Sequence, residues 1–340
     1  MLVLWGLAIA AQAAEPLPQL AASRDMVTVS GLSSGAFMAV QLQVAHSQLV
    51  RGVGVIAGGP YDCARGSTFR ALRNCMSPST DAPPPSADDQ RKRIAEAESS
   101  GAIDPVASLR RHRAWLFSGA NDKTVAPQVV DALAGFYGTQ LPAKALRYVR
   151  HPEAGHAMIS TADPRPNRCA TSRPPYINRC QGTDVAGELL SHLLGPLHPA
   201  SSSPAGAIVA FDQQAFFAGK AIDASMADEG YAYIPDVCRN GGCRVHVVFH
   251  GCEQSTTTIG RRFVEGAGYN GWADNNRLII LYPQATARQG VAFKSWKWIY
   301  NPKGCWDWWG YTGDGYATRN GVQIRGVRAM VDRLFEPLVN

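Results

Sequence analysis

Residues 31–35 read G-L-S-S-G, which matches the G-x-S-x-G pattern with Ser33 at its centre. In a tight turn from a strand to a helix, this pattern exposes the central serine, and glycine avoids clashes in the strained turn. The backbone N–H of Ser34 would then face an oxyanion at the N-terminus of the helix. A polar turn is the alternative interpretation, but an apolar segment precedes the pattern and a helical pattern follows it. The sequence therefore predicts that Ser33 is a nucleophile.

A serine nucleophile needs a histidine base and a carboxylate that orients the histidine. Asp122 follows an apolar run at 114–117, and His156 follows another at 145–149. Alone, Asp122 would also suit a turn or a helix cap, and His156 a surface position. Their order after Ser33, each at a predicted strand end, favours a catalytic triad. We expect structural roles for four other histidines: His46, His112, His151 and His192.

The second donor of an oxyanion hole normally comes from a loop upstream of the nucleophile, where this chain has too few residues. A strong strand pattern at 245–249 leads instead into H-G-C at 250–252, an oxyanion-type loop in the second half of the chain. The simplest explanation is a circular permutation that opened new ends before the nucleophile strand. This hypothesis predicts that the C-terminal helix near Leu334 lies beside the start of the strand at Met26.

Short apolar segments alternate with longer helical patterns, which indicates an α/β fold with a mostly parallel sheet flanked by helices. The patterns predict strands at 26–29, 52–57, 114–117, 145–149, 231–234, 244–249 and 278–282, and helices at 36–45, 184–194 and 322–334. Residues 196–206 have the Pro- and Ser-rich composition of a linker. Neither side of this linker holds a complete sheet with all catalytic parts. We therefore predict one permuted catalytic domain over 15–340, with the linker joining the ancestral termini.

The chain begins with about ten apolar residues followed by Ala-Gln-Ala, a pattern typical of a secretory signal. We predict a signal peptide at 1–14 and an extracellular or periplasmic protein. Eight cysteines in an exported chain indicate disulfides. Sequence alone allows 105 pairings, and proximity favours Cys63–Cys75, Cys169–Cys180, Cys238–Cys243 and Cys252–Cys305. A zinc site is the alternative, but no C-x-x-C or histidine cluster accompanies these cysteines.

Charge and hydropathy narrow the classes of partner. The net charge of +6 is spread along the 340 residues, and the densest basic run, 91–93, lies in a polar segment typical of a solvated helix face. We therefore expect no nucleic-acid partner. After the N-terminal stretch, no segment is apolar over enough residues to span a bilayer, so we expect no membrane partner.

Five of the eight tryptophans lie within the sixteen residues 296–311. Core packing is one interpretation, but a fully buried indole needs a partner for its N–H group. Adjacent tryptophans also tend to point to different sides. We therefore predict that Trp306, Trp308 and Trp309 line an apolar substrate groove, with Trp306 the foremost candidate.

The motifs H-G-C-E-Q at 250–254, L-Y-P-Q at 281–284 and G-C-W-D-W-W at 304–309 resemble those of polyhydroxybutyrate depolymerases and related polyester or feruloyl esterases. The resemblance covers nearly the whole chain after the N-terminal stretch, and the permuted order is similar to that of single-domain members. It implies an α/β-hydrolase fold with a Ser33, Asp122 and His156 triad. It also implies an oxyanion hole formed by the N–H groups of Ser34 and Cys252, and a Cys252–Cys305 disulfide that pins this loop to the aromatic segment.

The resemblance implies a secreted, monomeric serine esterase that acts on poly(3-hydroxybutyrate), related short-chain polyhydroxyalkanoates or their oligomers without a metal or cofactor. A feruloyl or acetyl esterase acting on plant polysaccharide would use the same triad with a different groove. A secreted polymer-binding protein on an inactive hydrolase scaffold is an alternative from another class. The complete Ser–Asp–His set argues against that alternative.

Overall fold

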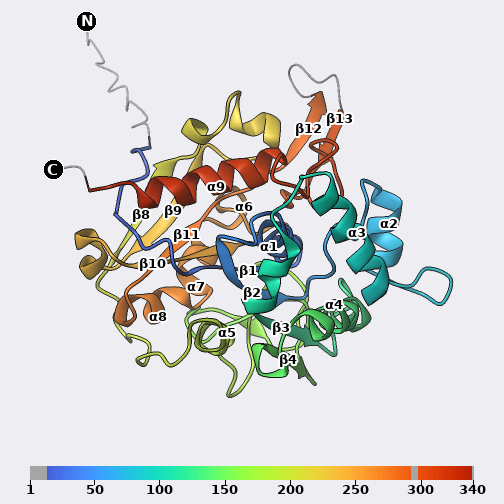
Figure 1. The fold of residues 1–340 in the computed structure, drawn as a ribbon. Helices are drawn as coiled ribbons and strands as arrows, with labels where there is room; N and C mark the ends of the chain where they lie inside the picture. The colour runs from blue at the N-terminus through green and yellow to red at the C-terminus, as the bar shows by residue number, and fades with distance from the viewer. Residues whose placement is uncertain (1–13, 292–297, 339–340) are drawn as a thin grey trace, which may run out of the picture.

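An eight-stranded, mostly parallel sheet forms the centre of the protein in a computed structural model that describes residues 14–291 and 298–338 (Figure 1). The predicted signal peptide falls outside the described residues except for Ala14. The strand order is β4 (Leu146–His151), β3 (Arg113–Gly119), β2 (Val50–Ile56), β1 (Val27–Leu32), β10 (Arg244–Phe249), β11 (Leu278–Tyr282), β9 (Glu229–Ile234) and β8 (Ala207–Asp212). The first six strands in this order, from β4 to β11, run parallel to one another. Strand β9 is antiparallel to both of its neighbours, β11 and β8.

Helices cover both faces of the sheet, so the central strands are buried on both sides and read as nearly continuous apolar runs. One core contains side chains of α1 (Ser34–Ala45), α3 (Ala87–Ser99), α4 (Pro127–Gln140) and α9 (Val322–Phe335), and the other those of α5 (Val185–Leu194) and α8 (Tyr269–Asn275). In β3, Ala114 and Leu116 join the first core, whereas Trp115 and Phe117 join the second. This is the alternation that an extended backbone imposes.

Smaller elements surround this three-layer core. The short helices are α2 (Thr68–Cys75), α6 (Thr256–Ile259), α7 (Arg262–Gly266), η1 (Val106–Arg111), η2 (Ala143–Ala145), η3 (Gln214–Phe216), η4 (Ala221–Ala224) and η5 (Asp236–Asn240). The short strands are β5 (Met158–Ile159), β6 (Asn167–Arg168), β7 (Ile177–Arg179), β12 (Arg288–Val291) and β13 (Trp298–Asn301). Every predicted strand and helix is present, with bounds shifted by at most three residues. The sequence patterns missed β8, the helices α2, α4, α6, α7 and α8, and all of the short strands and η helices.

The predicted linker, residues 196–206, is hydrogen-bonded to α8. The Ser201 N–H donates to the Gly271 carbonyl (2.8 Å), and the Gly206 N–H donates to Asp274 Oδ1 (3.1 Å). Strands from both sides of this segment belong to one sheet, because β1 pairs with β10. The predicted linker therefore connects two parts of the chain that build one sheet.

The chain ends meet as the permutation hypothesis requires. The Leu334 carbonyl of α9 accepts a hydrogen bond from the Ala22 N–H (2.9 Å), and the Glu336 carbonyl accepts one from the Ala21 N–H (2.9 Å). Figure 1 shows the start of the described chain running beside the end of α9. If β8 is counted first and β4 last, the sheet order is sequential except for β10 and β11. Consecutive strands usually lie side by side, so this order supports a permuted ancestor.

All eight cysteines form disulfides, in the pairing that sequence proximity favoured: Cys63–Cys75, Cys169–Cys180, Cys238–Cys243 and Cys252–Cys305. Within the described residues, the one cluster of potential metal ligands is His151 with Cys169 and Cys180, whose sulfurs are bonded to each other. Its sulfur atoms therefore cannot act as thiolate ligands.

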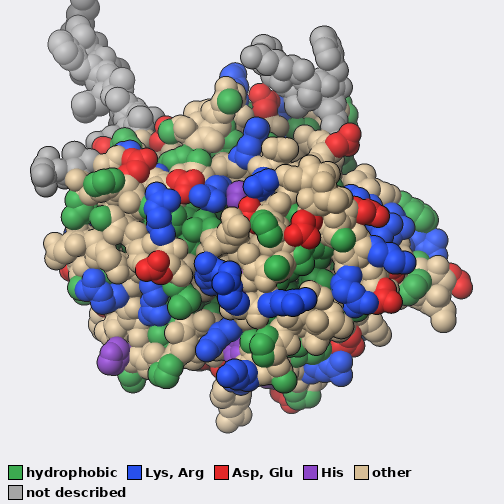
Figure 2. All heavy atoms as spheres, in the orientation of Figure 1, with side chains coloured by type: hydrophobic (Ala, Val, Ile, Leu, Met, Phe, Trp, Pro, Cys, Tyr) green, Lys and Arg blue, Asp and Glu red, His purple; other side chains and the backbone are tan. Residues whose placement is uncertain are grey.

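On the face in Figure 2, basic side chains are interspersed with acidic and apolar ones. Over the described ranges, no helix has both the length and the hydropathy needed to cross a bilayer.

Candidate active site

Ser33 occupies a strained turn between β1 and α1. Its backbone has φ +57° and ψ −123°, a conformation that a residue with a side chain rarely adopts. A Cβ atom at Gly31 would lie 2.3 Å from the Gly35 carbonyl carbon, and one at Gly35 would lie 2.4 Å from the His250 carbonyl oxygen. Both glycines of the G-x-S-x-G pattern are therefore required because other backbone atoms come too close for a side chain. At Gly31 these atoms belong to the turn itself, and at Gly35 they belong to the start of the H-G-C loop.

Asp122 and His156 form a buried pair beside this turn. The His156 Nδ1 atom lies 2.7 Å from Asp122 Oδ2. The other carboxylate oxygen, Oδ1, accepts hydrogen bonds from the N–H groups of Thr124 (2.8 Å) and Val125 (2.9 Å). With Nδ1 donating to the carboxylate, the Nε2 atom of a neutral imidazole can accept a proton.

The three predicted triad residues come together at one pocket. Ser33 and His156 both line it, and the exposed fractions of Ser33, Asp122 and His156 are 8%, 5% and 4%. Asp122 follows β3 and His156 lies in the loop after β4, so both lie at the carboxyl edge of the parallel sheet, as Ser33 does after β1. The arrangement can perform nucleophilic catalysis on an acyl group.

The four histidines with expected structural roles contact other parts of the fold. The ring of His112 is hydrogen-bonded to the Ser47 carbonyl, and that of His192 to the Ala145 carbonyl. Burial lowers the pKa of His46 and of His112 to about 4. His151 Nδ1 accepts hydrogen bonds from the backbone N–H groups of Glu153 and Ala154, and so shapes the loop that carries His156.

The H-G-C loop faces Ser33 across the pocket. Gly251 and Cys252 line the pocket, and a Cβ atom at Gly251 would lie 3.4 Å from the Ser33 Cβ. Ser34 is the first residue of α1, so its N–H has no acceptor within the helix. The N–H groups of Ser34 and Cys252 are thus on elements that meet at Ser33, where an oxyanion would form.

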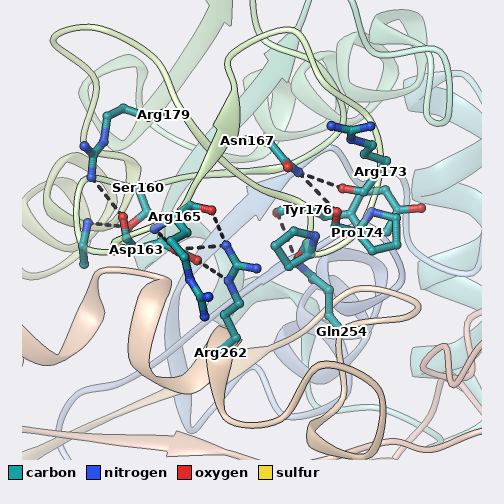
Figure 3. A network of polar contacts seen from close by, with 12 residues as sticks. Ser160, Asp163, Arg165, Asn167, Arg173, Pro174, Tyr176, Arg179, Gln254 and Arg262 are labelled. Atoms are coloured by element: carbon teal, nitrogen blue, oxygen red, sulfur yellow. Dashed lines mark hydrogen bonds and ion pairs between the residues drawn. The ribbon is translucent and has the colours of Figure 1, made fainter.

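Two side-chain anchors hold this loop. The Gly251 N–H donates to Gln254 Oε1 (2.7 Å), and Gln254 Nε2 donates to the carbonyls of Pro175 (2.8 Å) and Tyr176 (3.1 Å). Figure 3 shows Gln254 beneath the 173–176 segment. The Cys252–Cys305 disulfide attaches the loop to the aromatic segment. The loop is therefore fixed on both sides of Cys252.

The pocket has a volume of about 600 Å³ and mostly apolar walls. Phe37 of α1 stacks on Trp308 with ring centroids 4.2 Å apart, and Trp308 contacts Trp309 edge to face. Both tryptophans line the pocket. The other large apolar lining residues come from separate elements: Leu32, Leu72, Met76, Val125, Tyr176, Trp298, Tyr300 and Tyr311.

The prediction that Trp306 lines the groove is wrong. Its side chain is fully buried in the core and does not line the pocket. The ring packs edge to face on Phe249 and contacts His250. Its indole N–H has no hydrogen-bond partner among the described residues. The argument that an indole N–H resists burial therefore failed at this position, because aromatic packing outweighs the missing hydrogen bond.

Three pocket residues escaped the sequence analysis because they act together only after folding. The Tyr176 hydroxyl donates to Glu253 Oε2 (3.1 Å), and Lys303 Nζ lies 3.4 Å from the same oxygen. The Tyr176 ring also meets His156 edge to face, with centroids 6.1 Å apart. Burial and the Glu253 charge raise the pKa of Tyr176 to about 12. No motif joins these positions, although Glu253 belongs to the H-G-C-E-Q run.

No protein-family model matches the sequence. Among curated proteins, a polyhydroxybutyrate depolymerase of Talaromyces funiculosus is 34% identical over 340 residues, covering 98% of this chain and 96% of that protein. The chain belongs to the polyhydroxybutyrate depolymerase family. A poly(3-hydroxybutyrate) depolymerase of Delftia acidovorans is 40% identical over 328 residues, which are 95% of this chain and 62% of that protein.

Solved structures of polyhydroxybutyrate depolymerases share the fold. The enzyme from Penicillium funiculosum superposes with a TM-score of 0.83 at 34% sequence identity, covering 94% of this chain and 98% of that chain. A serine-to-alanine variant of a polyhydroxybutyrate depolymerase in complex with an R3HB trimer matches equally well. The fold expected from the sequence, an α/β-hydrolase with a mostly parallel sheet, is confirmed.

Proposed function

We propose that this protein is a secreted serine esterase that hydrolyses the ester bonds of poly(3-hydroxybutyrate), related short-chain polyhydroxyalkanoates and their oligomers. The observation that carries the proposal is the buried hydrogen bond between Asp122 and His156, together with the pocket that His156 and Ser33 both line. Membership of the polyhydroxybutyrate depolymerase family and the fold shared with a relative bound to an R3HB trimer support the choice of substrate. The four disulfides support an oxidising compartment outside the cytosol.

The proposed reaction runs through an acyl-enzyme. His156 Nε2 takes the proton of Ser33 as its hydroxyl oxygen attacks the ester carbonyl carbon, and Asp122 stabilises the imidazolium. The N–H groups of Ser34 and Cys252 stabilise the oxyanion. His156 then protonates the leaving alkoxide, and the carbonyl re-forms as the ester bond breaks. Water, deprotonated by His156, attacks the acyl-enzyme and releases the carboxylic acid and free Ser33.

The pocket walls favour a polyester over a polysaccharide-linked ester. A carbohydrate esterase needs polar groups around its groove, whereas Phe37, Trp308 and Trp309 present apolar surface here. The rim also carries apolar side chains, since Leu72, Trp298 and Tyr300 line the pocket and are exposed to solvent, beside the charged pair of Glu253 and Lys303. Apolar surface at the mouth suits a chain of methyl-bearing ester units.

Loss of turbidity of a poly(3-hydroxybutyrate) suspension tests this proposal when wild type is compared with Ser33→Ala. Wild type should clear the suspension, and the variant should lose roughly 10³-fold or more of the rate because the nucleophile is gone. Hydrolysis of p-nitrophenyl butyrate by the same two proteins separates the chemistry from the polymer.

The outcomes are distinct. If wild type alone cleaves p-nitrophenyl butyrate and neither protein clears the polymer, the triad stands and the polymer substrate is wrong. If both proteins act equally on either substrate, Ser33 is not the nucleophile and the mechanism fails.

A further inference from the structure

His250 is a buried histidine beside the catalytic pocket that takes no part in the triad. It follows β10 and is fully buried. Its Nε2 atom accepts a hydrogen bond from the Ala285 N–H at 3.0 Å. A backbone N–H can only donate, so Nε2 carries no proton and the proton of the neutral ring is on Nδ1. The Nδ1–H group then donates to the Gly251 carbonyl at 2.7 Å.

This hydrogen bond fixes the peptide group that joins Gly251 to Cys252. The peptide is trans, and the C=O and N–H of a trans peptide point in opposite directions. Because the carbonyl is held toward His250, the Cys252 N–H points away from the imidazole ring. Gly251 and Cys252 both line the pocket, and Gly251 packs against Ser33. Without this hold, the freely rotating glycine could turn its carbonyl toward the oxyanion.

The surroundings of His250 favour the neutral form of the ring and exclude water. Trp306 and Phe263 pack around the ring, with centroids 5.6 Å and 6.5 Å away. Burial lowers the pKa of His250 to about 4, so the ring is neutral near pH 7. The fully buried Trp306 thus has a place beside the active site, as packing against the histidine.

We propose that His250 is a positioning residue, which sets the Gly251–Cys252 peptide so that the Cys252 N–H serves the oxyanion hole. The proposal rests on the proposed esterase function. It assigns His250 no proton transfer and no contact with substrate. Its effect is confined to the transition state, where the negative charge on the carbonyl oxygen is greatest.

Two variants separate the two hydrogen bonds of His250. In His250→Asn, the amide nitrogen can take the place of Nδ1 and donate to the Gly251 carbonyl, while the acceptor for the Ala285 N–H is lost. In His250→Gln, the terminal amide oxygen can take the place of Nε2 and accept from Ala285, while the donor to Gly251 is lost. Each variant removes one hydrogen bond from the same buried site, so similar falls in melting temperature are expected. His112→Asn is the control for loss of a buried neutral imidazole outside the pocket lining, since His112 precedes β3 at the amino edge of the sheet.

The readouts are kcat and KM for p-nitrophenyl butyrate and the affinity for butaneboronic acid, which forms a tetrahedral adduct with a catalytic serine. For His250→Gln we expect kcat to fall on the order of 10- to 100-fold with little change in KM, because a displaced oxyanion donor acts mainly in the transition state. Boronate affinity should fall in parallel. His250→Asn should keep most of the kcat, and His112→Asn all of it.

Equal kcat values for the Asn and Gln variants would overturn the proposal, as would a fall in the Gln variant that appears in KM alone. Neither result bears on the substrate, since both concern ratios to wild type on a soluble ester. The proposed function fails separately, if wild type turns over no ester at all or if Ser33→Ala matches wild type.

Discussion

Ser33 has to satisfy two requirements that conflict in an ordinary turn. It must project a hydroxyl into the pocket, so it needs a side chain, yet its backbone has φ +57°, which disfavours any side chain. The surrounding structure imposes this conformation, because the Ser33 N–H donates to the Ile56 carbonyl while the Ser33 carbonyl accepts from Ala36 and Phe37. Strain at this residue therefore accompanies the placement of the proposed nucleophile at a strand–helix junction.

The strain at Ser33 predicts that two inactive variants will differ in stability. Ser33→Ala and Ser33→Gly both remove the hydroxyl and should both be inactive. Glycine adopts positive φ without a steric penalty, so Ser33→Gly should unfold with a free energy about 1 kcal/mol higher than Ser33→Ala, after allowance for the greater entropy of unfolded glycine. Urea denaturation of both variants measures the difference. An alanine variant at least as stable as the glycine variant would show that the turn is unstrained.

At the scale of elements, the site depends on the contact between the β1–α1 turn and the end of β10. A Cβ atom at Gly35 would lie 2.4 Å from the His250 carbonyl oxygen and 2.5 Å from that of Phe249. Both neighbours are backbone atoms, so the two elements would have to separate. Because the proposed nucleophile is on one element and the H-G-C loop on the other, we expect their separation to disturb stability and catalysis together.

Gly35→Ala is therefore expected to lower the free energy of unfolding by about 2 kcal/mol or more and to lower kcat for p-nitrophenyl butyrate at least tenfold. The matched control is Gly135→Ala in α4, where a Cβ atom would meet nothing within 4 Å. That change should raise the free energy of unfolding by about 0.5–1 kcal/mol, as alanine does inside a helix, and leave kcat unchanged. A Gly35→Ala protein with wild-type kcat would show that the contact between the two elements does not matter for catalysis.

The sequence could identify the elements that carry the proposed triad because each proposed triad residue lies within a few residues of the end of a strand. Ser33, Asp122 and His156 needed only local patterns and their order along the chain. Which tryptophan faces the pocket could not be read in that way. Trp306, Trp308 and Trp309 have almost the same local context, and only the packing of Trp306 on Phe249 and of Trp308 on Phe37 distinguishes them.

The rest of the pocket depends on surfaces that meet only in three dimensions. Leu72 on α2, Tyr176 before β7 and Trp298 on β13 are far apart in the sequence, and none belongs to a recognisable motif. Helix α4 was missed as well, although it begins at Pro127, shortly after Asp122. Long-range packing, rather than local propensity, decides these features.

The whole molecule combines one sheet from two halves of the chain with several buried, uncharged histidines. His112, His246 and His250 are each almost fully buried, and burial lowers their pKa values from 6.5 to about 4, 3 and 4. His246 lies on β10 beside β1, where its ring nitrogens are hydrogen-bonded to Thr28 and Ser30. These rings occupy positions in the core that have no solvent to stabilise a positive charge.

This burial predicts that the protein loses stability in mild acid. As pH falls from 6.5 toward 4, the unfolded chain takes up protons on these histidines while the folded protein does not, so each one lowers the free energy of unfolding by about 1.4 kcal/mol per pH unit. The stability contributed by neutral histidine is thus complete above pH 6.5 and is lost below pH 4. Urea denaturation at pH 7 and pH 4.5 should show a fall of several kcal/mol. In His112→Gln, which titrates one site fewer, the fall should be smaller by about 2–3 kcal/mol. Equal unfolding free energies at the two pH values would mean that the buried rings accept protons in the folded state.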